Sequence, residues 1–191
     1  MDVLKAAALV IALMASPARA DPVAQWRPYI AEASVRFGIP AEWIERVMHA
    51  ESAGMTTLNG RPITSKAGAM GLMQLMPATW AEMRAALGLG TDPNDPRDNI
   101  MAGSCYLRWM YDRFGYPGLF AAYNAGPGRY AAYLAGRAGL PTETVGYLAS
   151  VTSRTGAPAT ANRLPSIVAG RAPAVPPPDL LFFIRRTGDQ R

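Results

Sequence analysis

The stretch that decides the fold runs from Glu51 to Pro77 and reads ESAGMTTLNGRPITSKAGAMGLMQLMP. Its single acidic residue is Glu51, and 26 residues without Asp or Glu follow. Its several glycines disfavour a core helix, because each costs about 1 kcal/mol relative to alanine. Yet the stretch closes on an apolar run, Gly-Leu-Met-Gln-Leu-Met, which a solvated linker would not need. This pattern predicts a loop that folds back over the Glu51 carboxyl group and brings its backbone close to a ligand.

Helical patterns flank this stretch on both sides. Upstream, apolar residues three to four apart predict a helix over 23–37, and a second helix starts near Pro40 and reaches Glu51. The negative end of a helix dipole favours the protonated form of such a carboxyl group. Downstream, the same signals predict helices over 77–87, 96–114, 119–123, 129–138 and 142–155. Since no alternating strand pattern of useful length occurs, we expect an all-α domain of about seven helices.

The N-terminal residues 1–20 have the features of a secretory signal peptide. One Lys precedes an apolar run at 6–15, and an Ala-Arg-Ala cleavage site follows it. The apolar run is shorter than a bilayer span requires, which favours a signal peptide over the alternative of an N-terminal membrane anchor. Cleavage would leave a periplasmic chain that starts at Asp21 and has no transmembrane span.

The C-terminal residues 156–191 form a Pro- and Arg-rich segment without helical periodicity. This composition predicts a flexible tail, partly polyproline-like, after a single globular domain over 21–155. The tail ends in the apolar run Leu-Leu-Phe-Phe-Ile at 180–184, followed by two arginines. The run either covers an apolar patch on the domain or docks onto a partner protein or a membrane surface.

Charge and cysteine content exclude several classes of protein. The tail carries +3 of the formal net charge of +5, whereas residues 21–155 carry only +1 and show no basic stripe. Nucleic-acid binding is therefore not expected. The single cysteine, Cys105, cannot form an intramolecular disulfide and fits a buried apolar residue better than a reactive thiol. His49 is the only histidine and is interpreted as structural, so neither a metal site nor a cofactor is predicted.

Glu51 is the candidate catalytic residue, although the same residue type also caps or pairs at helix ends. A carboxyl group acts as an acid near neutral pH when apolar surroundings raise its pKa, and nearby methionines offer such surroundings. Glycoside cleavage usually uses two carboxylates. Here the next acid is Glu82, inside a predicted helix with an arginine two positions on. The sequence therefore favours a single catalytic carboxyl group, acting first as acid and then as base, with a substrate hydroxyl as nucleophile.

Five short motifs, in order, carry a resemblance to a known family. They are ESA at 51–53, SKAGAMGLMQLMP at 65–77, NIMAG at 99–103, AAYNAGPG at 121–128 and ETVGY at 143–147. Together they resemble the motif set of the soluble lytic transglycosylases, family 23 of the glycoside hydrolases. The resemblance covers about residues 23–151 and implies a lysozyme-like fold of the goose type. It also implies cleavage of the MurNAc–GlcNAc β-1,4 bond of peptidoglycan, in which the muramyl C6 hydroxyl attacks to give a 1,6-anhydro product.

The resemblance further implies roles for individual residues. Glu51 matches the catalytic acid/base, and Glu143 matches a structural or cleft-edge acid. The amide of Gln74 suits N-acetyl groups and tyrosine rings suit sugar faces, although from the residues alone a core tyrosine is the simpler interpretation. The segment 55–64 looks longer than the usual family connection, so the cleft edge is expected to differ. The substrate-binding residues implied in this way are Ser52, Ser65, Gln74, Met76, Tyr123, Asn124 and Tyr147.

The leading hypothesis is thus an exported, single-domain lytic transglycosylase that acts on peptidoglycan. It resembles the specialised enzymes that open the wall for type IV secretion or conjugation machinery, and the tail would suit docking to that machinery. Two alternatives stay open: a hydrolytic muramidase, and a non-catalytic peptidoglycan-binding scaffold of an envelope complex.

Overall fold

The computed structural model describes residues 21–153 of the chain. The signal peptide predicted at 1–20 and the tail predicted at 156–191 lie outside these residues. In the described part, seven α-helices confirm the predicted all-α fold class. None of these helices combines the length and the apolar character needed to cross a membrane. The helices are η1 (a 3-10 helix, Ala24–Trp26), α1 (Arg27–Phe37), α2 (Ala41–Ser52), α3 (Pro77–Leu87), α4 (Pro96–Phe114), α5 (Gly118–Ala125), α6 (Pro127–Leu134) and α7 (Thr142–Ser153).

Two helix boundaries differ from the prediction, and proline explains both. The segment 23–37 divides into η1 and α1, because Pro28 occupies the first turn of α1, where its missing N–H is tolerated. The helix predicted over 129–138 begins at Pro127 instead and ends at Leu134. A further difference is a short antiparallel pair of strands, β1 (Thr57–Leu58) and β2 (Arg61–Pro62), within the segment expected to be a loop.

Helix α4 is the centre of the core. All its residues from Asn99 to Leu107 are buried, because α1, α3 and α5 all pack against it. Gly103 lets the loop before α3 approach closely, since a Cβ at this position would lie 2.5 Å from the Cβ of Met73. Cys105 is a buried free cysteine, and burial raises the pKa of its thiol to about 11. The prediction of a buried, unreactive cysteine is therefore confirmed.

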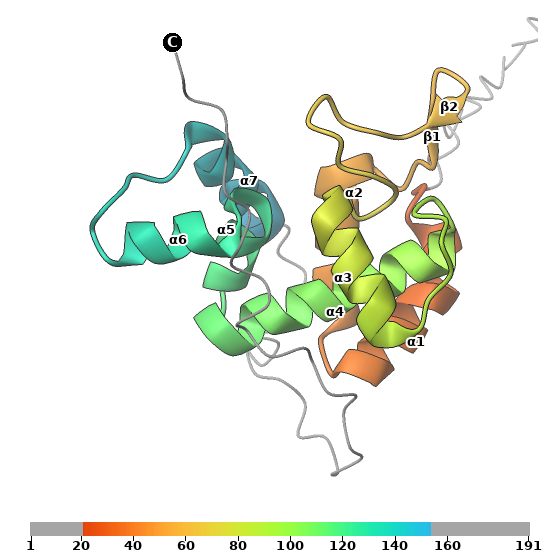
Figure 1. Ribbon diagram of the computed structural model, residues 1–191, viewed down its shortest axis with the longest axis horizontal. Coiled ribbons are helices and arrows are strands. Elements are labelled where there is room, and N and C mark those ends of the chain that lie inside the picture. The colour runs from red at the N-terminus through yellow and green to blue at the C-terminus, as the bar shows by residue number, and fades with distance from the viewer. Residues whose placement is uncertain (1–20, 154–191) are drawn as a thin grey trace, which may run out of the picture.

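The helices form two groups that α4 connects. Figure 1 shows α5, α6 and α7 on one side, α2 and α3 on the other, and α4 crossing below. An aromatic cluster around Trp43 of α2 links the groups: its ring centroid lies 5.4 Å from those of Tyr111 and Tyr116 and 6.0 Å from that of Phe120. This packing holds the first turn of α2 in a fixed position relative to α5.

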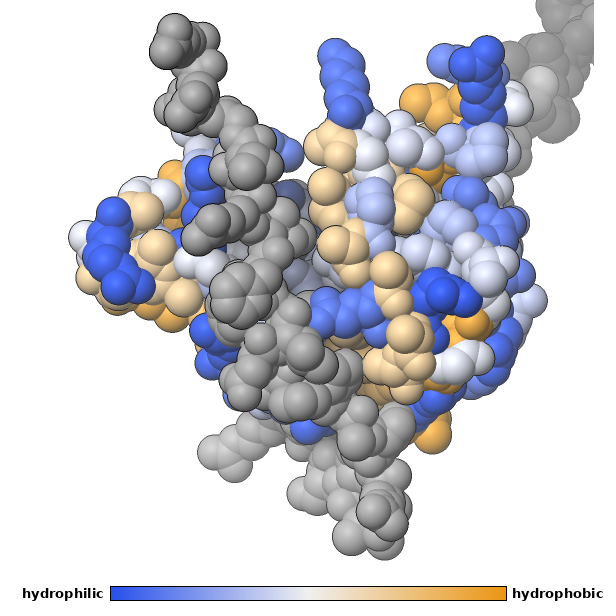
Figure 2. Space-filling view, viewed as in Figure 1, coloured by the Kyte–Doolittle hydropathy of each residue, from blue (hydrophilic) through white to orange (hydrophobic). Residues whose placement is uncertain are grey.

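The surface mixes hydrophilic residues with small groups of apolar ones, as Figure 2 shows for one face. Large apolar side chains that remain exposed are distributed over several elements, which is normal for globular domains. These side chains are Val35, Met55, Leu58, Met76, Tyr133, Leu134 and Val145.

Candidate active site

Glu51 lies in the last turn of α2, as predicted. The helix begins after Pro40 and has an acid, Glu42, in its first turn, where the dipole favours negative charge. It ends at Ser52, and Ala53 then adopts a left-handed conformation with φ of 52° that turns the chain away. The Glu51 side chain therefore projects from a helix end that the core fixes on its apolar side.

Burial gives the Glu51 carboxyl group an unusual acidity. It raises the pKa of Glu51 from 4.5 to about 7, because the charged form loses its hydration. The hydroxyl group of Tyr147 partly offsets this increase, whereas the negative charge of Glu143 adds to it. At neutral pH the group is thus close to half protonated, as a general acid and base requires.

Two tyrosines face this carboxyl group from the other group of helices. Tyr123 of α5 is buried, and its hydroxyl donates a hydrogen bond of 2.8 Å to the carbonyl of Met73. The hydroxyl of Tyr147 of α7 is buried beside Glu51 and makes no hydrogen bond of good geometry with the described residues. Burial, and then the charge of Glu51, raises the pKa of both tyrosines well above 10. Both therefore remain neutral, and the Tyr147 hydroxyl is available to donate towards the site.

A pocket of about 920 Å³ opens beside Tyr123, whereas Tyr147 and Glu51 are not among the residues that line it. Its volume lies within the range of small-ligand sites and accommodates a short saccharide. Four of the residues predicted to bind substrate line it: Gln74, Met76, Tyr123 and Asn124. The full lining consists of Gln74, Leu75, Met76, Pro77, Ala78, Thr79, Ala81, Glu82, Tyr106, Tyr123, Asn124, Ala125, Gly126 and Pro127.

The two serines predicted to bind substrate lie elsewhere. Ser52 is buried, and its hydroxyl donates to the carbonyl of Leu72 at 2.8 Å while it accepts from the N–H of Gly54 at 3.2 Å. This hydroxyl is used inside the protein, where it ties the end of α2 to the apolar loop. Ser65 is exposed, and its hydroxyl accepts from the N–H of Ala69 at 3.0 Å within the loop. Neither side chain lines the pocket.

The loop before α3 is organised by one buried side chain of α4. The Asn99 side-chain oxygen accepts from the N–H of Met73 at 2.7 Å. Its amide nitrogen donates to the carbonyls of Pro93 at 2.8 Å and of Met70 at 3.2 Å. The motif NIMAG at 99–103 contains Asn99, but the sequence alone predicts no role for this residue. The available signal was an asparagine at the inner face of a predicted core helix, where a polar group needs partners.

Gln74 is held by the same loop. Its backbone has a positive φ of 45°, and its side-chain nitrogen donates to the carbonyl of Gly71 at 2.8 Å. The internal bond uses the donor end of the amide. The side-chain oxygen accepts no hydrogen bond from a described side chain or backbone group, so it can accept one from a ligand in the pocket that Gln74 lines.

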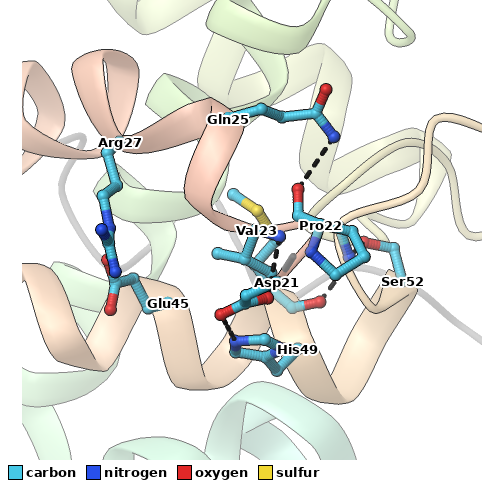
Figure 3. A network of polar contacts seen from close by, with 10 residues as sticks. Asp21, Pro22, Val23, Gln25, Arg27, Glu45, His49 and Ser52 are labelled. Atoms are coloured by element: carbon cyan, nitrogen blue, oxygen red, sulfur yellow. Dashed lines mark hydrogen bonds and ion pairs between the residues drawn. The ribbon is translucent and has the colours of Figure 1, made fainter. Parts of the chain in front are cut away.

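The N-terminal residues of the described part clamp the end of α2. Figure 3 shows the Asp21 carboxylate against His49, with 3.0 Å between Asp21 Oδ2 and His49 Nε2. The indole N–H of Trp26 donates to the carbonyl of Gly54 at 2.8 Å. The contact with Asp21 agrees with the interpretation of His49 as a structural residue. Within residues 21–153, no group of three or more His, Cys, Asp or Glu side chains could hold a metal ion.

We expect Gly54→Ala to destabilise the domain much more than Gly60→Ala. Both glycines have a positive φ, 76° and 74°, so the backbone strain is matched. At Gly54, however, an added Cβ would lie 2.7 Å from the backbone of Pro22, whereas at Gly60 nothing lies within 4 Å. The strain alone costs on the order of 1 kcal/mol, and the collision adds about 1–3 kcal/mol. Thermal unfolding followed by circular dichroism measures the difference. Equal losses in Tm would contradict the close packing of Gly54 against Pro22.

Comparison with known proteins identifies the family of the chain. The family model of the transglycosylase SLT domain matches residues 28–145, so the chain belongs to the SLT transglycosylase domain family. The soluble lytic murein transglycosylase of Escherichia coli K12 is 42% identical over 84 residues, covering 40% of this chain and 13% of that protein. A transglycosylase of Enterobacteria phage PRD1 is 42% identical over 91 residues, covering 48% and 31%.

Solved structures agree with this assignment. An inactive mutant of the lytic transglycosylase Slt from Pseudomonas aeruginosa superimposes with a TM-score of 0.59 at 30% identity, covering 70% of this chain and 23% of that one. The 70 kDa soluble lytic transglycosylase of Escherichia coli gives a TM-score of 0.58 at 30% identity, covering 66% and 22%. The fold of these lytic transglycosylases confirms the predicted lysozyme-like class. This chain spans less than a third of the length of each of these relatives.

Proposed function

We propose that the protein is a peptidoglycan lytic transglycosylase that cleaves the MurNAc–GlcNAc β-1,4 bond without water. The observation that carries this proposal is the Glu51 carboxyl group, which has a pKa of about 7 and whose charge acts on the neutral tyrosines Tyr123 and Tyr147. Tyr123 also lines the saccharide-sized pocket. Membership of the SLT domain family supports it, since relatives in this family are named lytic murein transglycosylases.

The chemistry follows from one group that changes its protonation state. Protonated Glu51 donates its proton to the glycosidic oxygen, and the bond between that oxygen and the muramyl C1 breaks. The C6 hydroxyl of the same muramyl unit then attacks C1, and the Glu51 carboxylate accepts the hydroxyl proton. The products are a 1,6-anhydro muramyl end and a free GlcNAc hydroxyl, and Glu51 is protonated again. The neutral Tyr147 hydroxyl stabilises the carboxylate form between the two steps.

Product analysis tests this proposal directly. The mature chain is incubated with purified sacculi, and the released muropeptides are identified by mass spectrometry. We expect anhydro-muramyl ends, which are lighter by one water than reducing ends. Reducing ends alone would indicate a hydrolytic muramidase, and binding without any release would indicate a scaffold.

The rate of cleavage should fall as the pH rises above about 7. Glu51 must donate a proton in the first step, and its protonated form is lost as the pH rises through its pKa of about 7. We therefore expect kcat/KM to fall by about tenfold per pH unit in the alkaline range. The measurement is the initial rate on soluble glycan strands between about pH 5 and 9, with circular dichroism at each pH as the control for folding. A rate that climbs steadily towards pH 9 would contradict the acid role.

The proposal extends to the cellular role. We infer that the enzyme is exported to the periplasm, where it makes local openings in the wall for an envelope-spanning secretion or conjugation apparatus. The signal-peptide pattern at 1–20 and the basic, Pro-rich segment at 156–191 support this role. A chain truncated after Thr155 is expected to lyse purified sacculi normally. It should fail to associate with the apparatus in cells, as measured by cross-linking.

A further inference from the structure

Glu82 occupies a position that its place in the sequence did not suggest. The sequence puts it inside a helix, two residues before Arg84, as an ordinary surface acid. The structure instead places it on the face of α3 that lines the 920 Å³ pocket, together with Thr79 of the same helix and Tyr106 of α4. Glu82 therefore borders the space in which a ligand would lie, and its charge acts on Tyr106, which lines the same space.

This carboxylate has no partner within the part of the chain that the structure describes. Every other residue that lines the pocket is uncharged, and no hydrogen bond or ion pair of Glu82 to a described residue is recorded. Arg84 does not neutralise it, because its guanidinium group donates to the carbonyl of Gly90 at 2.7 Å. Two other glutamates of the described domain are paired: Glu32 with Arg97, and Glu45 with Arg27.

The Glu82 side chain is partly buried, so the lack of a hydrogen-bond donor for its carboxylate has an energetic cost. Glu82 is half-buried, and burial raises the pKa of its carboxyl group. A carboxylate withdrawn from water without a hydrogen-bond donor carries a desolvation cost that a bound donor would remove. A ligand rich in hydroxyl and amide N–H groups supplies such donors.

Glu82 is not positioned as a second catalytic carboxylate. Burial, and then the charge of Glu82, raises the pKa of Tyr106, whereas burial, and then the charge of Glu51, raises that of Tyr123. The two tyrosine rings are neighbours, with centroids 5.3 Å apart. Each acid thus acts on a different member of the pair, and Glu82 does not contribute to the raised pKa of Glu51. This separation suits a residue that binds a sugar unit away from the bond being cleaved.

We propose that Glu82 is a further saccharide-binding residue, whose carboxylate accepts hydrogen bonds from hydroxyl or N-acetyl N–H groups of a sugar unit in this pocket. The inference rests on the proposed function, because that function supplies the glycan. It adds a binding contact that depends on Glu82 and is independent of the proton transfer by Glu51.

The test measures binding of tetra-N-acetylchitotetraose, a saccharide without peptide, to the mature chain. All variants carry Glu51→Gln so that no ligand is cleaved, and titration calorimetry gives the Kd. We expect Glu82→Gln to weaken binding by about tenfold, as for loss of a charge-assisted hydrogen bond. Glu82→Asp keeps the charge and should recover part of the affinity. Glu45→Gln removes the same charge outside the pocket and should leave the Kd unchanged.

Three outcomes would overturn the inference, and they are distinguishable. Unchanged affinity in Glu82→Gln would show that the carboxylate does not contact the saccharide. Unchanged affinity for the saccharide with weaker binding of peptide-bearing muropeptides would assign Glu82 to the stem peptide. A parent protein that binds neither ligand would contradict the proposed function as well, whereas the first two outcomes leave that function intact.

Discussion

We expect Glu51→Gln to lower kcat on purified peptidoglycan by a factor on the order of 10³ while the domain remains folded. Glutamine has nearly the same shape as glutamic acid but cannot donate a proton to the glycosidic oxygen or accept one from the C6 hydroxyl. Since no other described acid is coupled to the site except Glu143, which has the smallest effect on the pKa of Glu51, no substitute is at hand. Release of anhydro-muropeptides measures the loss, and Glu45→Gln is the control with unchanged activity. Undiminished lysis would disprove the role of Glu51.

The same variant should be more stable than the parent at neutral pH. The folded-state pKa of Glu51 is about 7 and the ordinary value is 4.5, so between these values the folded state binds more protons than the unfolded state. Stability therefore falls as the pH rises from about 4.5 to 7, by up to about 3 kcal/mol. Glutamine does not titrate and avoids this loss. Urea unfolding at pH 4 and 8 checks the sign: the advantage of the variant should appear only at the higher pH, and a variant less stable at pH 8 would contradict it.

Asn99→Ala is expected to lower the free energy of unfolding by about 3–5 kcal/mol. The substitution leaves the Met73 N–H and the Pro93 carbonyl without their partner inside the protein. It also removes one of two donors to the Met70 carbonyl, which keeps its bond from the N–H of Leu75. It also frees the loop that carries Gln74, so the affinity for saccharide should fall in any fraction that still folds. Urea unfolding measures the stability, and titration with tetra-N-acetylchitotetraose measures the affinity.

A matched asparagine separates this effect from general loss of a polar side chain. Asn94 lies five residues before Asn99, and its amide nitrogen contacts only the nearby Asp92, at 3.1 Å. Asn94→Ala should change the stability by less than about 0.5 kcal/mol. Similar losses in both variants would show that Asn99 does not organise the loop.

Much of the fold could be predicted because glycine and proline mark its boundaries. Gly38, Gly88 and Gly115 end helices in the structure where the sequence places them. The raised pKa of Glu51 could also be anticipated in direction, since burial causes it and the apolar segment that follows Glu51 offers such surroundings. Residue spacing and local composition carry these features.

Contacts between distant segments could not be predicted in the same way. Asn99 binds a loop more than 25 residues away, and Ser52 bonds to Leu72 across the same loop. Nothing in the local pattern around Glu82 distinguishes a pocket residue from a solvated one, because the difference depends on which face of α3 packs against α4. Tertiary packing decides these positions, which is why the serine roles and Glu82 emerged only from the structure.

The acid of this site is kept protonated mainly by the exclusion of water, to which the packing of α7 beside α2 contributes. The pKa of Glu51 therefore depends on how the helices pack around it and is not fixed by the residue type alone. When water reaches the carboxyl group, its pKa returns towards 4.5, and at neutral pH the proton leaves. The packing of the helices thus sets the acidity of the catalytic group, since burial within the domain itself raises its pKa to about 7.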